Sequence, residues 1–373
     1  MGLHQPHIKS LMKPLRIYVR IPWVANNGVG FYRMYQPLKY AEQKGEVEVV
    51  FQSFTFEKGQ EKFPTEKELA EYGQWADILY FARNDVPDYL AIAGGLKEAY
   101  KKKLVFDFDD NVQATRPYNP GYRSFHPNSA NMMWNIKSCG VMDAMTASTN
   151  NLKEYYTRYQ PNIYVCPNGI DYTERDKNFK KSYRGSKLFK KNKDEIRIGW
   201  SGSSSHWENL QRAEKAVLDI LRKYPQTTFY FTGLFGGLFN DPKLIAEGRI
   251  RTVGFANLKQ YGSLLKESNY DIAIAPLADN MFNRAKSNLR ILEYASCKYP
   301  VIASDVEPYR CFTDKEVKLV TEYEDWYAAL EELVLNKSKR EELSNNLYKR
   351  CKKEFDISVT YKYWIKAFRS ILK

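Results

Sequence analysis

The sequence predicts an α/β protein with two doubly wound parallel β-sheets. Short runs rich in β-branched and aromatic residues alternate with helix-length amphipathic segments, and this series occurs twice along the 373 residues. A basic stretch rich in lysine and asparagine, residues 172–194, lies between the two series and has no convincing apolar period. Since 373 residues exceed the usual size of one hydrophobic core, we expect two domains with their boundary in this stretch.

Each half of the chain contains six strand-like runs, the number expected for a doubly wound sheet. In the first half they cover residues 15–21, 47–54, 76–82, 103–109, 141–148 and 162–167. In the second half they cover residues 195–201, 227–233, 249–255, 270–277, 299–304 and 316–321, and three helical patterns then close the chain. The expected division is an N-terminal domain over 1–175, a basic linker or surface excursion over 176–194, a second domain over 195–356 and a terminal helix over 357–373.

The composition is that of a globular protein, with 43% hydrophobic and 27% charged residues. Five widely spaced cysteines without a CxxC pair argue against a disulfide framework or a zinc site. No apolar stretch reaches the roughly 20 residues that cross a bilayer, and the first residues lack the apolar core of a signal peptide. We therefore expect a cytoplasmic protein, with peripheral association with a membrane or with DNA left open.

The net charge of +13 is concentrated in two segments. Residues 174–195 carry nine lysines and arginines against four acids, and residues 337–373 carry eleven against four. One interpretation is solvated helix faces. The other is an anionic acceptor or surface, such as DNA, a lipid headgroup or an anionic polymer.

A glycine-rich turn follows the first predicted strand. Gly28 and Gly30 precede a helix, and such a turn exposes backbone N–H groups and the positive end of the helix dipole to an anion. Arg33 stands where the dinucleotide fingerprint has its third glycine, which excludes that motif. We expect Arg33 to project one turn into the helix and to reach a phosphate or carboxylate, although a purely structural turn explains the glycines equally well.

Three aspartates crowd the end of the fourth predicted strand, in the run DFDDNV. Strand alternation predicts that Asp107 and Asp109 share one face and that Asp110 lies on the other. Carboxylates this close repel one another unless a cation, a base or a ligand hydroxyl lies near them. The alternatives are helix capping together with a loop hydrogen bond, or a metal cluster.

A small-residue loop follows the seventh predicted strand, in the run GWSGSSSHWENL. Ser201, Gly202 and Ser203 offer hydroxyls and accessible backbone N–H groups at a helix N-terminus, an arrangement that can hold a diphosphate. No GxxxxGK[ST] motif is present, so P-loop chemistry is excluded. His206 is a candidate phosphate donor or simply the first residue of the helix.

The run SNLRILEYASCKYPVIAS, residues 287–304, places a carboxylate on an inward-facing position of a predicted helix. Ser287 is the expected N-cap. Lys286 and Glu293 lie seven residues apart, on nearly the same helix face with about 10 Å of axial separation. This spacing suits a nucleotide, with Lys286 near the phosphates and Glu293 on ribose hydroxyls; the alternative is a Glu293 that pairs with an arginine.

The residues just described resemble the retaining, glycogen-synthase-like (glycosyltransferase group 1) enzymes of the GT-B fold, over nearly the whole chain. The strongest match is DIAIAPLADNMFNRAKSNLRILEYASCKYPVIASDVEPY, followed by RIGWSGSSSHWENL and VCPNGID, while GVGFYRMYQPL and VFDFDDNV resemble a bacterial and phage subgroup. The resemblance implies two Rossmann-like domains that face a central cleft, an N-terminal acceptor domain and a C-terminal donor domain. It also implies sugar transfer from a nucleotide sugar, UDP- or GDP-linked, to an acceptor hydroxyl, with retention and without a metal or other cofactor.

Residue by residue, the resemblance makes Glu293 the ribose-binding glutamate of the family's EX7E motif. The first glutamate, which contacts the donor sugar, falls at Ala285, so Arg284, Lys286 or the backbone of 281–285 are the candidates to replace it. Asp109 and Asp110 fall near a His–Asp pair of many relatives and, with Lys286, are the catalytic candidates. The final helix pattern, 358–371, would cross back onto the N-terminal domain.

Three other functions stay open at this point. The positive charge favours a related enzyme that glycosylates a modified base in DNA. Ala285 favours a nucleotide-binding GT-B protein without transferase activity. An epimerase of the same fold would need further acid/base carboxylates, which the sequence does not reveal. The donor base, the sugar, the acceptor and the oligomeric state are not identified.

Overall fold

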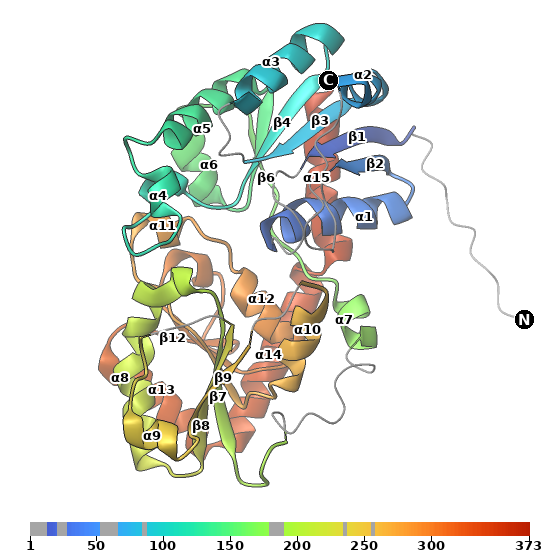
Figure 1. Ribbon diagram of the computed structural model, residues 1–373. Coiled ribbons are helices and arrows are strands. Elements are labelled where there is room, and N and C mark those ends of the chain that lie inside the picture. Colours follow the sequence, from blue (N-terminus) through green and yellow to red (C-terminus); the bar gives the residue numbers. More distant parts are fainter. Residues whose placement is uncertain are drawn as a thin grey trace, which may run out of the picture.

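A computed structural model describes residues 13–20, 28–52, 66–83, 88–178, 190–233, 237–254 and 258–373. Two six-stranded parallel sheets, one in each half of the chain, lie one above the other (Figure 1). The N-terminal sheet has the order β2-β1-β3-β4-β5-β6 and the C-terminal sheet the order β12-β11-β10-β7-β8-β9. Both are doubly wound, and each of the twelve predicted strand runs contains or overlaps one observed strand.

The strands of the N-terminal sheet are β1 (Leu15–Arg20), β2 (Val47–Gln52), β3 (Ile78–Ala82), β4 (Lys103–Phe108), β5 (Ala144–Ala147) and β6 (Ile163–Val165). Those of the C-terminal sheet are β7 (Ile196–Gly202), β8 (Thr227–Gly233), β9 (Ile250–Val253), β10 (Ile272–Ala275), β11 (Val301–Ser304) and β12 (Val317–Val320). The order of strands reverses between β1 and β3 in the first sheet and between β10 and β7 in the second. In such sheets a ligand binds beyond the carboxyl ends of the strands at this reversal.

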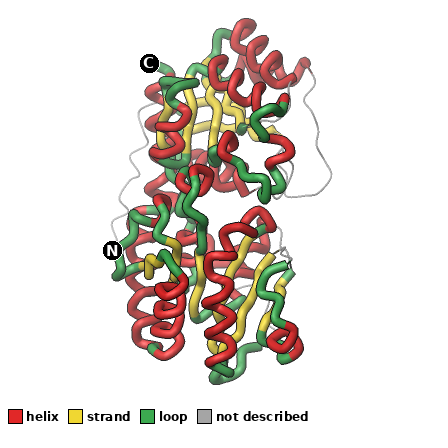
Figure 2. The backbone as a smooth tube through the Cα atoms, turned by 90° about the vertical axis from the view of Figure 1, so that its left-hand side faces the viewer, coloured by secondary structure: helices red, strands yellow, loops and turns green. Residues whose placement is uncertain are grey.

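Helices cover both faces of each sheet (Figure 2). On the N-terminal sheet, α2 (Glu66–Trp75), α3 (Asp88–Tyr100), α5 (Ala130–Val141) and α6 (Asn150–Tyr156) share one core, and α1 (Gln36–Gln43) shares the other with α15 (Ile357–Ile371). On the C-terminal sheet, α8 (Trp207–Lys223) and α13 (Tyr323–Leu335) cover one face, while α10 (Leu258–Glu267), α12 (Leu289–Ser296) and α14 (Lys337–Glu354) cover the other. The remaining helices are α4 (Tyr122–Phe125), α7 (Tyr172–Asn178), α9 (Pro242–Ala246) and α11 (Met281–Arg284).

The chain passes between the two halves twice, at neighbouring positions. The backbone of Ile170 is hydrogen-bonded to Phe355 and Ile357, so the first and second crossings lie side by side. Beyond this point α15 packs against α1 of the N-terminal half, and Nε1 of its buried Trp364 donates to the hydroxyl of Tyr80 in β3 (3.1 Å). The last helix is therefore part of the N-terminal core (Figure 1).

Two local expectations can be compared with the structure. Ser287 was expected to be the N-cap of α12, but Asn288 holds that position and the helix begins at Leu289. The hydroxyl of Ser287 still accepts from the backbone N–H of Leu289 (3.4 Å), and it also accepts from Nδ2 of Asn168 (2.8 Å). The basic stretch 172–194 was expected to be a linker or surface excursion. Its first residues form α7, and residues 179–189 lie outside the described residues.

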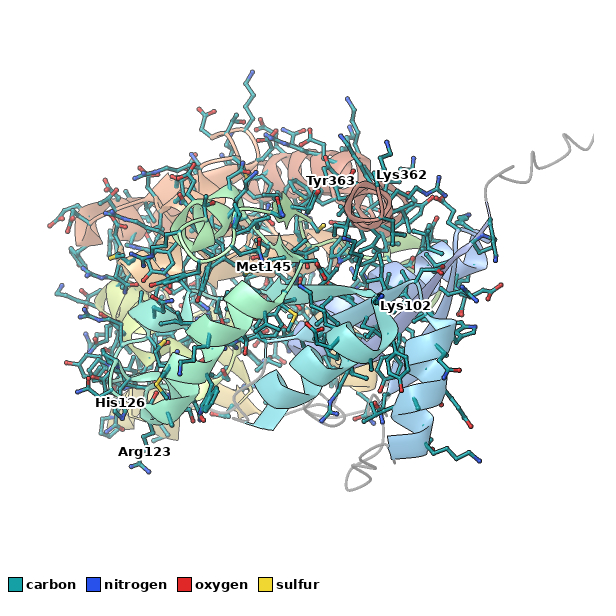
Figure 3. All side chains as sticks on the ribbon, turned by 90° about the horizontal axis from the view of Figure 1, so that it is seen from above. Lys102, Arg123, His126, Met145, Lys362 and Tyr363 are labelled. Carbon is teal, nitrogen blue, oxygen red and sulfur yellow. The ribbon has the colours of Figure 1, made fainter. Side chains whose placement is uncertain are left out.

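Some lysines and arginines of the basic C-terminal segment form ion pairs within the protein. In 337–373, Lys337 pairs with Glu341, Lys339 with Glu342, and Arg350 with Glu316 and Glu354. Lys362 of this segment is on the surface and projects outward from α15, as does its uncharged neighbour Tyr363, which is 47% exposed (Figure 3).

Candidate active site

A cavity of about 500 Å³ lies between the two halves, at the carboxyl ends of the strands. Both halves supply its walls. The lining residues of the N-terminal half are Gly28, Val29, Tyr32, Arg33, Asp109, Asp110 and Asn168. Those of the C-terminal half are Gly202, Ser203, Ser205, His206, Thr232, Gly233, Leu258, Tyr261, Leu277, Lys286, Ser287, Leu289, Arg290, Glu293 and Tyr309.

The glycine-rich turn after β1 contributes one wall of the cavity. Gly28 lines it, whereas Gly30 is buried at the start of a π-helical turn, Gly30–Tyr35, that leads into α1. This turn carries Tyr32 and Arg33 toward the cavity. Its backbone geometry was not predicted, because the sequence pattern indicated an ordinary helix start.

Arg33 is committed to the protein rather than to a ligand. Its guanidinium is 1% exposed, donates two hydrogen bonds to Asp107 (2.8 and 3.1 Å), and also bonds Asn168 (3.0 Å) and the carbonyl of Cys166. The expected contact of Arg33 with a carboxylate is thus with Asp107 of β4. Most of its N–H groups are engaged, so Arg33 forms the floor of the cavity and is not directed at a phosphate.

Asp109 and Asp110 both line the cavity, although alternation predicted opposite faces. The strand ends at Phe108, so strand geometry no longer applies to them. Asp110 accepts from Lys286 (3.0 Å), and Asp109 lies 3.7 Å from the guanidinium of Arg83.

The environments of these two carboxyl groups separate their pKa values. Burial and the adjacent Asp110 raise the pKa of Asp109 to about 6. Burial opposes ionisation of Asp110 too, but Lys286 and Arg83 hold the pKa of Asp110 below its ordinary value. At neutral pH Asp110 is the firmly ionised member of the pair.

Glu293 is 7% exposed and lies on the cavity wall formed by α12. One carboxylate oxygen accepts from Tyr32 (2.8 Å), a residue of the other half, and the second from Tyr261 (3.2 Å). Burial and Glu293 raise the pKa of Tyr32, so its hydroxyl stays protonated and donates. Nη2 of Arg175 donates to the Tyr32 hydroxyl (2.8 Å), so the arginine supports the carboxylate through the tyrosine. Each oxygen retains lone-pair capacity for a further donor.

The small-residue loop after β7 forms another part of the cavity wall. Gly202, Ser203 and Ser205 line the cavity, whereas Ser201 is buried behind it, with its hydroxyl 2.5 Å from that of Tyr261. Gly233, at the end of β8, has φ +128°, and a Cβ there would overlap the carbonyl oxygen of Gly202. The two glycines therefore allow β7 and β8 to approach closely at the cavity wall.

Arg290 is a cavity residue that sequence reasoning missed. Its guanidinium lies 5.2 Å from the ring centroid of Trp200, Nη2 is 3.3 Å from Nε2 of His206, and Nη1 has no hydrogen-bond partner among the described residues. The sequence did carry a signal: Arg290 is three residues before Glu293, so the two share a helix face. Lys286 was expected on the same helix face, but α12 begins at Leu289, so Lys286 reaches the cavity from the preceding loop.

Arg284 lies outside the cavity, contrary to expectation. Its half-exposed side chain forms an ion pair with Asp279 (2.5 Å). Ala285 is 3% exposed, and its carbonyl accepts from Thr149 of the other half (2.9 Å). In the resembled enzymes this position holds a glutamate; here the backbone of Ala285 forms a contact between the two halves.

The described parts of the chain contain no group of three or more His, Cys, Asp or Glu side chains arranged to hold a metal ion. Among the same residues, no helix combines the length and the apolar character needed to span a bilayer.

The chain is similar to one protein family in sequence and to several solved structures in fold. Residues 211–366 match a family described as glycosyl transferase-like. HepE of Anabaena, solved with UDP and glucose, is 14% identical, with 95% of this chain and 100% of that chain covered and a TM-score of 0.62. A glycosyltransferase of Rickettsia africae is 13% identical, with coverage of 97% and 100% and a TM-score of 0.63.

A UDP-forming α,α-trehalose-phosphate synthase of Burkholderia xenovorans is 12% identical, with coverage of 96% and 100% and a TM-score of 0.61. No curated protein matches the sequence significantly. The chain has the GT-B fold, with two Rossmann-like halves that face a central cavity.

Proposed function

We propose that the protein, a glycosyltransferase by its family match and fold, transfers a sugar from a UDP-linked donor to an acceptor hydroxyl, with retention and without a metal ion. The observation that carries the proposal is the shared cavity wall of Lys286, Arg290 and Glu293. Two cations, Lys286 just before α12 and Arg290 within it, and the carboxylate of Glu293 match the diphosphate and the ribose of a nucleotide sugar. The solved structures of HepE with UDP and with UDP-glucose support the choice of base.

In the proposed complex, Glu293 accepts hydrogen bonds from the ribose hydroxyls. Tyr32 and Tyr261 already orient both of its oxygens, so the carboxylate is held in place before the nucleotide arrives. Pre-oriented acceptors of this kind lose little conformational entropy on binding.

The diphosphate lies against Lys286, Arg290 and the loop Gly202–Ser203. Negative charge grows on the β-phosphate as the bond to the sugar breaks, and fixed cations and N–H groups in a partly buried cavity stabilise that charge. This stabilisation needs no metal ion, which is why we propose a metal-independent reaction.

The sugar and the acceptor lie toward Asp109 and Asp110. An ionised Asp110 accepts from sugar hydroxyls, and Asp109, whose pKa of about 6 lies near neutrality, accepts from a hydroxyl of the acceptor other than the reacting one. In a front-face retaining reaction the acceptor proton passes to the departing phosphate, so neither aspartate acts as a nucleophile.

The test is a thermal-shift panel of UDP-, GDP-, ADP- and CMP-sugars on the wild type, on Glu293→Ala and on the control Glu324→Ala, an exposed glutamate of α13. We expect stabilisation by UDP-sugars of the wild type and the control, and its loss in Glu293→Ala. Product analysis by NMR, with and without EDTA, then reads the anomeric configuration and the need for a metal. No response to any nucleotide, or an equal response in Glu293→Ala, would contradict the donor site.

A further inference from the structure

His206 immediately precedes α8 and lies on the cavity wall, where both ring nitrogens have polar neighbours. Nδ1 is 3.0 Å from Nδ2 of Asn209, and Nε2 is 3.3 Å from Nη2 of Arg290. A neutral imidazole carries one proton, so only one of its nitrogens can donate. Which nitrogen donates depends on the orientation of the Asn209 amide.

The backbone N–H and the backbone carbonyl of Ala278 fix the orientation of the Asn209 amide, the N–H directly and the carbonyl through Asn283. The backbone N–H of Ala278 donates to Oδ1 of Asn209 (2.9 Å), and Nδ2 of Asn283 donates to the same oxygen (2.7 Å). The amide of Asn283 is itself fixed, because its Nδ2 also donates to the carbonyl of Ala278 (2.8 Å). A backbone N–H can only donate and a carbonyl can only accept. Asn209, 4% exposed, therefore presents its N–H group to His206.

It follows that Nδ1 of His206 accepts and that the imidazole proton resides on Nε2. Nε2–H and the N–H groups of Arg290 are then both donors and cannot bond to each other. They border the cavity beside Gly202 and Ser203, and among the described residues neither Nε2–H of His206 nor Nη1 of Arg290 has a hydrogen-bond acceptor. A phosphate oxygen supplies one, at the N-terminus of a 17-residue helix whose dipole also favours an anion.

The imidazolium form is disfavoured by the same contacts. A second proton on Nδ1 would face the N–H of Asn209. Burial and the cations that face the ring, Arg290 and Lys286, lower the pKa of His206 well below its ordinary value.

We infer that Asn209, held by Asn283 and the Ala278 backbone, is a positioning residue that fixes His206 as a neutral Nε2–H donor to the donor diphosphate. The inference rests on the proposed function for the identity of the anion, but the tautomer itself does not depend on it. A neutral donor adds a directed hydrogen bond beside the cations Arg290 and Lys286, and this bond strengthens as charge grows on the leaving phosphate.

The first test reads the tautomer directly. Two-bond ¹H–¹⁵N correlation spectra of ¹⁵N-histidine-labelled wild type at pH 7 distinguish the two neutral forms and the imidazolium. His206→Gln identifies the His206 signals among those of the four histidines of the chain. We expect the Nε2–H form, and a shift of its signals on addition of UDP-glucose. A resting Nδ1–H form or an imidazolium overturns the inference whatever the variants do.

The second test uses Asn209→Asp, which keeps the acceptor for Ala278 and Asn283 but offers His206 an acceptor at Nδ1. In that variant we expect a proton on Nδ1 and, at pH 8.5, loss of Nε2–H with about tenfold weaker binding of UDP-glucose. The new negative charge also weakens binding, independently of the tautomer. A double-mutant cycle with His206→Gln separates the effect of the charge from the effect of the tautomer. The amide of the glutamine keeps a donor near the Nε2 position.

We expect Asn209→Asp to cost at least about fivefold more affinity in the wild type than in the His206→Gln background. An equal loss in both backgrounds shows that Asn209 does not act through His206 and overturns its positioning role. If the Nε2–H tautomer is confirmed but the protein binds no UDP-glucose, the proposed donor is wrong. The role of the Nε2–H group in diphosphate binding is then wrong as well.

Discussion

The ammonium group of Lys286 lies 3.0 Å from Oδ1 of Asp110, so an ion pair joins the two walls of the cavity. Lys286 also lies 4.4 Å from the ring centroid of Phe282. A diphosphate bound by Lys286 has to share this ammonium with Asp110. The pair thus links donor binding in the C-terminal half to the proposed sugar contact in the N-terminal half.

Asp110→Asn and Lys286→Met should change donor affinity in opposite directions. The first removes the competitor of the phosphates, so we expect UDP to bind about threefold more tightly. Sugar transfer should fall, because a neutral amide replaces the charged acceptor of the sugar hydroxyls. The second removes a charge-assisted contact and should weaken UDP at least about tenfold. Calorimetry and steady-state kinetics measure the two effects. Arg284→Ala, whose ion pair lies outside the cavity, is the matched control and should leave affinity unchanged.

Arg290 should not tolerate replacement by lysine. Its planar group lies over Trp200 and presents two donor nitrogens toward His206 and the cavity, a geometry that an ammonium cannot reproduce. We expect Arg290→Lys to weaken UDP binding about tenfold and Arg290→Met about a hundredfold, in calorimetric titrations at constant ionic strength. Equal affinity of the lysine variant and the wild type would show that only the charge matters.

Asp109 should make stability depend on pH in a defined direction. Its pKa of about 6 lies above the ordinary value of 3.8, so the folded protein holds this proton more tightly than the unfolded chain. The stabilising contribution of the protonated group is complete below 3.8 and is lost as the pH rises through about 6. Asp109→Asn should therefore be more stable than the wild type by about 1–3 kcal/mol at pH 7.5. The gain should vanish below pH 3.8, where Asp109 is protonated in both the folded and the unfolded protein.

Thermal unfolding at several pH values checks this. Asp279→Asn, at an exposed ion pair, is the control, because the pKa of Asp279 is lowered and its removal cannot stabilise through the same linkage. If the difference in unfolding free energy between Asp109→Asn and the wild type were constant across the pH range, titration of the Asp109 carboxyl group would not be the cause of the stabilisation.

The strands and the order of elements could be predicted from the sequence because parallel sheets bury both faces, and continuous apolar runs identify them. The candidate site was predicted where chain order suffices: loops after strand ends converge at one edge, which brought Asp109, Asp110, Gly202 and His206 into the same cavity. What a side chain does there depends on partners distant in sequence. Arg33 has the residue type of a phosphate ligand, yet Asp107, 74 residues away, engages it.

Tyr32 was not predicted for a related reason. A π-helical turn determines where its hydroxyl points, and its partner Glu293 lies 261 residues further along the chain. Likewise, the alternation applied to Asp109 and Asp110 failed because β4 ends at Phe108, and strand boundaries are set by the pairing of neighbouring strands rather than by local sequence.

The last helix should be required for the integrity of the cavity floor. Trp364 is fully buried in α15, its ring centroid is 4.9 Å from the guanidinium carbon of Arg33, and its N–H donates to Tyr80. The Tyr80 hydroxyl in turn lies 3.0 Å from Asp107, the partner of Arg33. Trp364→Ala should lose about 3–5 kcal/mol of unfolding free energy, since a large cavity opens in the core.

Trp364→Phe keeps an aromatic ring and loses the N–H donor, so it separates packing from the hydrogen bond to Tyr80. We expect a loss of about 1–3 kcal/mol, because Tyr80 is buried and loses one partner. Urea unfolding followed by circular dichroism measures both variants. Lys362→Ala, on the exposed face of the same helix, should leave stability nearly unchanged because that side chain is in solvent (Figure 3). If Trp364→Ala were as stable as Lys362→Ala, Trp364 would be dispensable to the N-terminal core, and Asp107, Asn168 and the carbonyl of Cys166 would hold Arg33 without it.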